Sequence, residues 1–164
     1  MGGQLYQEDT NDMITVDRAT EKDIREFADN IRYMDEKEVK IVSGKPFRDQ
    51  LDELIRNKKH VKVIRCDGVL LGIGGWYKEM LDWGLYSQGV VGWMLLTPAV
   101  EDHKIAFLRW SKWLVKYLLD TYPYITNTAY IGNTLHIRFL EFLGAHFHLD
   151  PFNSKLVHFY IERS

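Results

Sequence analysis

The sequence has a single cysteine, Cys66, only four prolines and no long uninterrupted apolar run. One thiol cannot form a disulfide within the chain, so the sequence indicates a reducing compartment such as a bacterial cytoplasm. No apolar run approaches the roughly 20 residues of a membrane-spanning helix. The first twelve residues are polar and lack the basic stretch and apolar core of a signal peptide, which predicts a soluble protein.

A strong charge of either sign is also missing. The chain has 21 lysines and arginines against 23 aspartates and glutamates, a formal net charge of -2. This balance provides no bulk attraction to nucleic acid or to an anionic membrane, although a local basic patch stays open.

The composition is that of a globular protein, with 46% hydrophobic residues in 164. A chain of this length predicts one domain. Residues 1–12 are polar and predict a flexible lead-in, which leaves residues 13–164 as a single α/β domain.

Periodicity and turn signals predict the order of the elements. Asp67-Gly68 joins two strand-like runs and is a strong hairpin signal. Thr20 and Asp23 predict the cap of the first helix, and Pro123 ends the longest one. The predicted strands are 13–18, 61–66, 69–77, 90–96, 124–131, 145–149 and 156–161. The predicted helices are 20–31, a second stretch from about 35 to 57 that Gly44, Lys45 and Pro46 interrupt, one that starts within 98–104, and 133–144; residues 78–88 are predicted as a loop.

The stretch from Tyr130 to Phe147 predicts a strand, a short helix and another strand. Asn133 can cap the helix by accepting hydrogen bonds from its free N–H groups, and Gly144 can end it. A structural cap is favoured over a ligand contact for Asn133, and both roles can coexist. His136, in the first turn, contacts either a cofactor or solvent.

Three other patterns each have two interpretations. Gly72, Gly74 and Gly75 could form a phosphate loop, but they lie in a hairpin and open no helix, so close packing or a bulge is favoured. Cys66 is favoured as a buried small hydrophobe over a catalytic thiol. Trp110, Trp113 and Tyr117 widen the apolar stripe of the long helix, which indicates either deep burial or a second contact face.

Histidines gather near the C-terminus, on the last two predicted strands. His146 and His148 are two residues apart and therefore share a face, and His158 lies on the next strand. A metal site needs a further ligand in register and supporting hydrogen bonds, so no metal is expected.

The element order, together with the segment from Asn133 to Gly144, resembles the GNAT acetyltransferase fold from about Ile14 onward. The resemblance implies one α/β domain with a mixed central sheet of about seven strands and about four helices on both faces. It also implies that the strand before the long helix splays from its neighbour and that acetyl-CoA lies in the gap. The family holds the cofactor pyrophosphate on N–H groups of a glycine-containing loop at the helix start.

Aligned on Thr97-Pro98, that loop corresponds to Glu101–Ala106, where Ala106 matches the final small residue of the family pattern. Glu101 replaces its cationic or amide residue and Lys104 its central glycine. The acids Glu101 and Asp102 oppose phosphate binding, and His103 and Lys104 could partly compensate; a solvated first turn whose acids favour the helix dipole is preferred over a phosphate site. The cofactor-binding residues that the resemblance implies are Leu95, Leu96, His103, Lys104, Ile105, Ala106, Asn133 and His136.

The family's tyrosine, whose hydroxyl can protonate the departing CoA thiolate, falls at Leu140, which has no proton to donate. Glu79, Asp82 and Glu101 are candidates for a general base, and no pattern singles one out. The catalytic residues are therefore not identified from the sequence.

A tighter resemblance rests on Trp93-Met94-Leu95, on the string from Gly132 to Leu140, and on Gly144-Ala145 with Phe147-His148. These segments resemble the GNAT-like internal virion protein family of short-tailed bacteriophages. The resemblance implies a phage protein of virion assembly or genome delivery in the host cytoplasm or the virion, with phage structural or host proteins as partners. Two hypotheses follow: an interaction scaffold with a degenerate acetyl-CoA site, or an active N-acetyltransferase that acetylates an amine on a small molecule or host protein.

Overall fold

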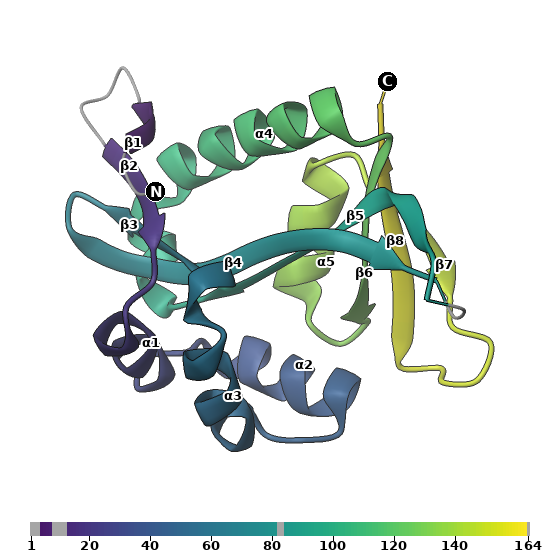
Figure 1. Cartoon of the computed structure of the whole chain (residues 1–164), viewed down its shortest axis with the longest axis horizontal. Coiled ribbons are helices and arrows are strands. Elements are labelled where there is room, and N and C mark those ends of the chain that lie inside the picture. Colours follow the sequence, from purple (N-terminus) through teal and green to yellow (C-terminus); the bar gives the residue numbers. More distant parts are fainter. Residues whose placement is uncertain (1–3, 8–12, 82–83, 164) are drawn as a thin grey trace. The chain divides into compact units, whose positions relative to one another are not determined.

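The structure is a computed structural model that describes residues 4–7, 13–81 and 84–163. Eight strands form one sheet in the order β1-β2-β3-β4-β5-β6-β8-β7 (Figure 1). The sheet is mixed, because β5 and β6 run parallel while β6 and β8 run antiparallel. The strands are β1 (Gln4–Gln7), β2 (Met13–Arg18), β3 (Lys62–Cys66), β4 (Val69–Met80), β5 (Tyr86–Leu96), β6 (Tyr124–Tyr130), β7 (His146–Leu149) and β8 (Leu156–Glu162).

Within the described residues, five α-helices and three short 3-10 helices accompany the sheet, and the predicted α/β domain with a mixed sheet is confirmed. The seven predicted strands are present, and β1 adds an eighth. The helices are α1 (Glu21–Ala28), α2 (Tyr33–Ser43), η1 (Phe47–Gln50), α3 (Leu51–Arg56), η2 (Lys58–His60), η3 (Pro98–His103), α4 (Lys104–Thr121) and α5 (Thr134–Phe142).

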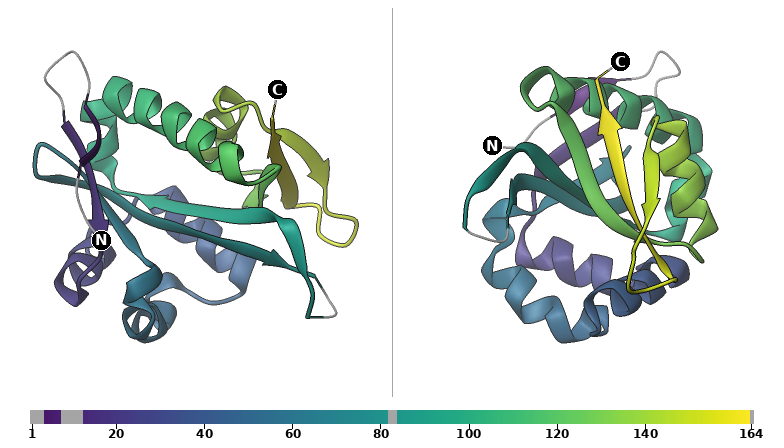
Figure 2. Two further views of the ribbon diagram at one scale, coloured as in Figure 1. Left: turned by 45° about the horizontal axis from the view of Figure 1, so that its top comes forward. Right: turned by 90° about the vertical axis from the view of Figure 1, so that its right-hand side faces the viewer.

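Two segments differ from the sequence-based expectation. Within the predicted lead-in 1–12, residues 4–7 form β1, which pairs with β2, while 1–3 and 8–12 lie outside the described residues. The predicted loop over 78–88 is too long, because β4 continues to Met80 and β5 already begins at Tyr86 (Figure 2). Beyond these strand ends the Leu81 N–H donates to the Leu85 carbonyl over 2.6 Å. The sequence near the end of the β4–β5 hairpin does not alternate between apolar and polar residues, because the apolar side chains of Met80, Leu81, Leu85 and Tyr86 are all exposed.

The chain divides into two compact units. Unit 1 comprises Met1–Gly75 and Met94–Trp110, and unit 2 comprises Trp76–Trp93 and Ser111–Ser164. β4, β5 and α4 each contribute residues to both units.

Unit 1 packs α1 and η1 through Phe27 and Phe47, whose rings meet edge-on with centroids 5.7 Å apart. The predicted Thr20–Asp23 cap is confirmed as a reciprocal capping box at the start of α1. Cys66 is fully buried, which agrees with the structural interpretation of this thiol.

Gly72 in β4 shows why a glycine stands in this strand. A Cβ at this position would lie 2.4 Å from the carbonyl oxygen of Leu95 in β5, which is closer than any real contact. The close approach of two strands therefore explains this glycine, and the interpretation as a packing residue is confirmed for Gly72.

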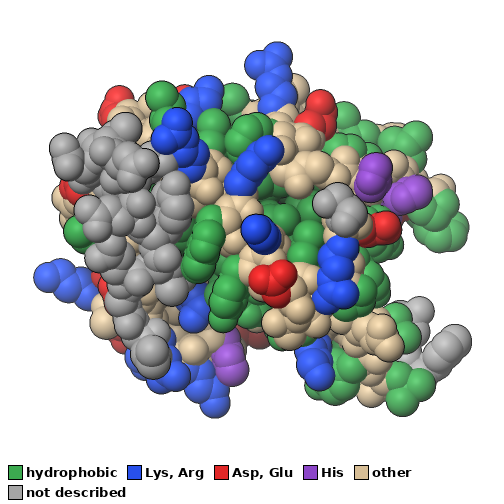
Figure 3. Space-filling view, turned by 90° about the horizontal axis from the view of Figure 1, so that it is seen from above, with side chains coloured by type: hydrophobic (Ala, Val, Ile, Leu, Met, Phe, Trp, Pro, Cys, Tyr) green, Lys and Arg blue, Asp and Glu red, His purple; other side chains and the backbone are tan. Residues whose placement is uncertain are grey.

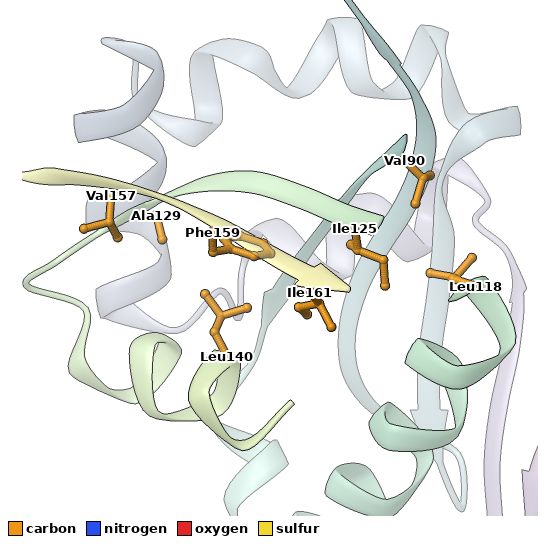
Figure 4. Close-up of a cluster of buried hydrophobic side chains, with 8 residues drawn as sticks. All are labelled: Val90, Leu118, Ile125, Ala129, Leu140, Val157, Phe159 and Ile161. Carbon is orange, nitrogen blue, oxygen red and sulfur yellow. The ribbon is translucent and has the colours of Figure 1, made fainter. Parts of the chain in front are cut away.

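Unit 2 has its own apolar core, where α4 and α5 pack on the same face of its strands (Figure 4). Leu118 of α4 and Leu140 of α5 point toward Ile125, Phe159 and Ile161. Burying a side chain of this size stabilises the fold by about 1.5–3 kcal/mol. In α4, Trp110 is buried, as the interpretation of deep burial predicts, while Tyr117 is exposed and stacks on Trp113.

Candidate functional site

The end of β5 carries two of the predicted cofactor-binding residues, Leu95 and Leu96. Successive residues of a strand direct their backbone groups to opposite edges. The Thr97 N–H donates to the Leu71 carbonyl of β4 over 2.8 Å, and its hydroxyl donates to the Leu70 carbonyl over 2.8 Å. The backbone N–H and C=O of Leu96 therefore point to the edge of β5 that faces away from β4.

Residues at the start of α2 occupy these backbone groups. The Leu96 N–H donates to Oδ2 of Asp35 over 2.8 Å, and the Leu96 carbonyl accepts the Arg32 N–H over 2.8 Å. Both backbone groups of Leu96 are thus paired within the chain. An extended ligand that ran along this edge would have to bind the same two groups.

The Asp35 carboxylate is nearly inaccessible to solvent, with 3% of the residue exposed. Its other oxygen, Oδ1, accepts hydrogen bonds from Nη2 and Nε of Arg32 at 2.9 and 3.3 Å. Asp35 also lies in the first turn of α2, where the helix dipole favours a negative charge. The buried charge is therefore compensated on every side by an ion pair, a backbone N–H and a helix end.

The predicted pyrophosphate loop is a compact 3-10 turn rather than an open glycine loop. Pro98 begins η3, and Val100 is buried in the core. The acidic side chains of Glu101 and Asp102 are exposed, directly before α4 begins at Lys104. Carboxylates at this position favour the dipole of the helix and repel a phosphate, so these residues do not fit the pyrophosphate of a cofactor.

The remaining predicted residues of this segment line the start of α4. Ile105 is 65% exposed, whereas Ala106 is buried with 1% exposed. His103 is half-buried, and the side chain of Lys104 is exposed. The structure brings these four residues together on one short segment of unit 1, while Asn133 and His136 belong to unit 2.

In unit 2 the parallel strands β5 and β6 pair over only two positions, Val90 with Ile125 and Val91 with Thr126. Immediately beyond them, the side chain of Asn127 donates from Nδ2 to the Gly92 carbonyl over 2.9 Å. A side chain thus replaces the main-chain ladder at the point where the pairing ends.

Asn133 is fully buried and caps α5, as its sequence position predicts. Its Oδ1 accepts the His136 N–H at 3.4 Å, and its own N–H donates to the Tyr130 carbonyl over 3.0 Å. His136 is half-buried, and its ring meets Phe159 edge-on with centroids 6.5 Å apart. Both residues therefore have structural contacts within unit 2.

Leu140, which occupies the position of the family's tyrosine, is buried in the core of unit 2 with 4% exposed. A hydroxyl at this position would enter an apolar cluster. Of the candidate general bases, Glu101 is exposed and Asp82 lies outside the described residues.

The third candidate base, Glu79, belongs to a polar cluster that the sequence did not predict. Its Oε1 lies 2.6 Å from the hydroxyl of Tyr124 and 2.8 Å from that of Ser87. The hydrogen bond to the Glu79 carboxylate raises the pKa of Tyr124, against the opposing effect of Ser87. Tyr124 therefore keeps its hydroxyl proton. Its ring packs on Gly89, where a Cβ atom would lie only 2.1 Å from a ring carbon of Tyr124.

The histidines near the C-terminus do not assemble a metal centre in the part of the chain that the structure describes. His148 and His158 face each other across β7 and β8. His158 instead links two strands to a turn: its Nε2 lies 2.8 Å from Oδ2 of Asp150, and its Nδ1 lies 3.0 Å from Oγ1 of Thr128. Hydrogen bonds from the Phe152 N–H and from His158 lower the pKa of Asp150.

No helix among residues 4–7, 13–81 and 84–163 is both long and apolar enough to cross a membrane.

Solved structures with a similar fold include acetyltransferases of the GNAT family. An acetyltransferase of this family from Bacillus anthracis shares 13% identity over 99% of this chain and 98% of its own, with a TM-score of 0.69. An acetyltransferase from Agrobacterium tumefaciens shares 14% identity over 98% and 94%, with a TM-score of 0.68. The aminoglycoside acetyltransferase AAC(6')-Ib, solved in complex with coenzyme A, shares 18% identity over 92% and 95%, with a TM-score of 0.62. At these identities the likeness establishes the GNAT fold.

No curated protein matches the sequence. A family model described as "Bacteriophage T7, probable scaffold protein Gp13" matches residues 60–151, which is more than half of the chain. The match spans most of the segments that carry the sequence resemblance to phage proteins, including the string from Gly132 to Leu140. The chain therefore belongs to the bacteriophage T7 Gp13 family of probable scaffold proteins and has the GNAT fold.

Proposed function

We propose that this phage protein uses the GNAT fold as an interaction scaffold in virion assembly or genome delivery and that its acetyl-CoA site is degenerate. The observation that carries the proposal is the pairing of the Leu96 N–H and C=O with Asp35 and Arg32. A cofactor that lay along β5 would have to displace Oδ2 of Asp35 and the Arg32 N–H from Leu96. A hydrogen bond to a charged group contributes about 1.5–3 kcal/mol, so its loss would reduce affinity by about ten- to a hundredfold.

Two further observations support a degenerate site. Glu101 and Asp102 precede α4 where phosphates would need positive charge or free N–H groups. Leu140 replaces a hydroxyl that could protonate a thiolate, and its own side chain is buried in an apolar cluster and has no proton to donate.

Titration calorimetry with acetyl-CoA tests the cofactor part of the proposal. We expect no saturable heat at millimolar cofactor. Saturable binding near micromolar concentration that disappears in Ala106→Trp, but not in the exposed-site variant Lys116→Ser, would overturn it. Thermal unfolding of both variants without ligand verifies that each is folded.

The alternative is an active N-acetyltransferase that moves acetyl from acetyl-CoA to an amine on a small molecule or host protein. The early end of the β5–β6 pairing at Val91 and Thr126 favours it, since the family places its cofactor in such a gap. Release of free thiol from acetyl-CoA in the presence of amines, above the rate without protein, would support this alternative against the scaffold.

The assembly role has its own test. We expect the chain in the host cytoplasm during infection and in assembling or mature particles, bound to phage structural or host proteins. Mass spectrometry of purified assembly intermediates and mature particles measures this directly. A chain that is present in infected cells but never in any particle or intermediate would contradict a role in the virion.

A further inference from the structure

Cations gather in unit 1 where β2 ends and β3 begins. Between Glu53 and Asp67 every charged residue of the sequence is a lysine or an arginine. The whole chain has a net charge of -2, so this excess is local; Figure 3 shows lysine and arginine side chains close together, beside a histidine, at the lower left of one face. We name the set in unit 1 the basic junction; its members are Arg18, Arg56, Lys58, Lys59, His60 and Lys62.

Main-chain contacts hold the members of the basic junction near one another. Arg18 of β2 and Lys62 of β3 are directly opposite each other in the antiparallel pair. Immediately after β2, the Ala19 N–H donates to the Val61 carbonyl over 2.8 Å. The turn η2, Lys58–His60, leads into β3 and lies against β2. The end of β2, the turn and the start of β3 therefore present their cations in one region of unit 1.

Most of these cations are accessible and have no counterion within the protein. The exposed members that form no ion pair with any residue in the described ranges are Arg18, Arg56, Lys58 and Lys59. The acids of the neighbouring helix α1 already have other partners. Glu21 pairs with Arg25 at 3.0 Å, and both Asp23 and Glu26 pair with Arg65 at 2.9 Å. The positive charge of the junction is therefore left for an anion from outside the chain.

The strand register gives a second indication of an anionic ligand. Like charges directly opposite each other in an antiparallel pair destabilise it, and Arg18 and Lys62 stand in this relation. The helix dipole explains a cation such as Arg56 in the last turn of α3, but it does not explain two cations on strands. An anion that contacts Arg18 and Lys62 together would remove their repulsion.

The side chains of the junction fit a DNA duplex better than a protein or a single strand. Protein interfaces depend on buried apolar and aromatic anchors, and single-stranded nucleic acid stacks its bases on aromatic rings. The junction contains neither. The large apolar side chains described as exposed in unit 1 lie elsewhere in it and are Tyr33, Val42, Val69 and Ile105. The regularly spaced phosphates of a duplex need only cations, which are what the junction offers.

We propose that the basic junction binds the phosphate backbone of duplex DNA without regard to base sequence. The chain belongs to a phage family, and the genome is the polyanion that a phage protein meets both in the infected cell and in the particle. Binding of this kind requires no cofactor and no catalytic residue. It therefore goes beyond the scaffold role and does not depend on the state of the acetyl-CoA site.

Fluorescence anisotropy of a short labelled duplex, titrated with the full chain, tests the proposal. We expect a dissociation constant on the order of 10 µM at about 50 mM salt, and a rise of about a hundredfold at about 200 mM, because roughly four phosphates release their counterions. Two duplexes of unrelated sequence should bind equally well. Absence of binding up to about 1 mM protein at the lower salt concentration overturns the proposal.

Variants with matched changes in charge locate the binding surface. Lys58→Gln with Lys59→Gln should weaken binding at least tenfold and reduce the steepness of the salt dependence by about two phosphates. The control, Lys116→Gln with Lys155→Gln, removes the same charge from exposed lysines of unit 2 and should change the affinity less than twofold. Equal losses in the two double variants would mean that only net charge matters, which contradicts the assignment.

A single substitution separates binding from folding. Arg18→Gln ends the repulsion with Lys62, so it should weaken DNA binding without lowering the temperature of thermal unfolding. An unchanged affinity in this variant would contradict a site that includes the end of β2.

Other polyanions complete the test. Anionic phospholipid vesicles and polyglutamate, compared with the duplex at equal concentrations of negative charge, should compete weakly. If either competes as well as unlabelled duplex, DNA is not the preferred ligand and the proposal fails. Failure here leaves the scaffold proposal standing, since acetyl-CoA calorimetry and mass spectrometry of particles have separate readouts.

Discussion

Asp35 in unit 1 and Asn133 in unit 2 are both buried polar side chains that accept a backbone N–H, yet they act over different ranges. Asn133 caps the helix that begins beside it, with a partner three residues away. Asp35 accepts the N–H of Leu96, which is 61 residues away in the sequence. The local contact determines where a helix begins, whereas the distant one joins a helix to the edge of a strand and closes that edge.

Removal of the distant contact should have the larger effect. Asp35→Ala leaves the guanidinium of Arg32, whose side chain is only 14% exposed, without its carboxylate, and it leaves the Leu96 N–H unpaired. We expect the free energy of unfolding to fall by about 3–5 kcal/mol, measured by urea denaturation. The control Glu36→Ala removes a first-turn acid of the same helix that is only half-buried, and it should cost well under 1 kcal/mol. Equal losses in the two variants would mean that Asp35 acts only through the helix dipole.

Removal of the local contact should cost less. Asn133→Ala deletes the cap of α5 and leaves a buried N–H without its acceptor. We expect a loss of about 1–3 kcal/mol in the same denaturation experiment. The adjacent Thr134→Ala is exposed and makes no cap, so it should be nearly neutral. If Asn133→Ala lowered the free energy of unfolding as much as Asp35→Ala, the distance in sequence between the partners would not explain how much each contact stabilises the fold.

A third polar side chain, the half-buried carboxylate of Asp23, has one partner nearby in the sequence and one far away, Thr20 and Arg65, and we expect the smallest effect from its substitution. Burial raises its pKa, but hydrogen bonds from the Thr20 N–H and from Arg65 outweigh this and leave the pKa below its ordinary value of 3.8. A carboxyl that binds protons less readily when folded stabilises the protein above its unfolded pKa. That stabilisation is lost as the pH falls through the lower, folded pKa.

We therefore expect Asp23→Asn to flatten the decline of stability with pH below about 4, relative to the wild type. Thermal unfolding at a series of pH values measures the slope. A slope that is identical in Asp23→Asn and in the wild type would contradict a native pKa below that of the unfolded chain.

The contrast between contacts local in sequence and contacts between distant residues explains which features the sequence could predict. The caps at Thr20 and Asn133, the hairpin at Asp67-Gly68 and the end of α5 at Gly144 depend on residues within a few positions. Tertiary packing decides the rest. Nothing near Asp35 in the sequence signals that its carboxylate binds the end of β5, so the closure of that edge could not be predicted.

Other missed features have the same physical origin. The cluster of Tyr124, Glu79 and Ser87 forms only when three strands come together. The long β4–β5 hairpin was missed because its end projects from the fold and lacks the alternation of a half-buried strand. The predicted cofactor-binding residues came from alignment to a family. The alignment located the segments, but it could not predict that Asp35 and Arg32 bind the backbone of Leu96.

The bond between Asp35 and Leu96 also bears on how the protein is made. Unit 1 is discontinuous in sequence, so α2 leaves the ribosome well before the end of β5 exists. Until residue 96 emerges, the Asp35 carboxylate has no N–H to bind at β5. Contacts between distant residues of this kind form late in folding, after the cost of loop closure has been met. Substitution of Asp35 should therefore accelerate unfolding more than it slows folding, which makes this contact a determinant of how long the finished protein persists.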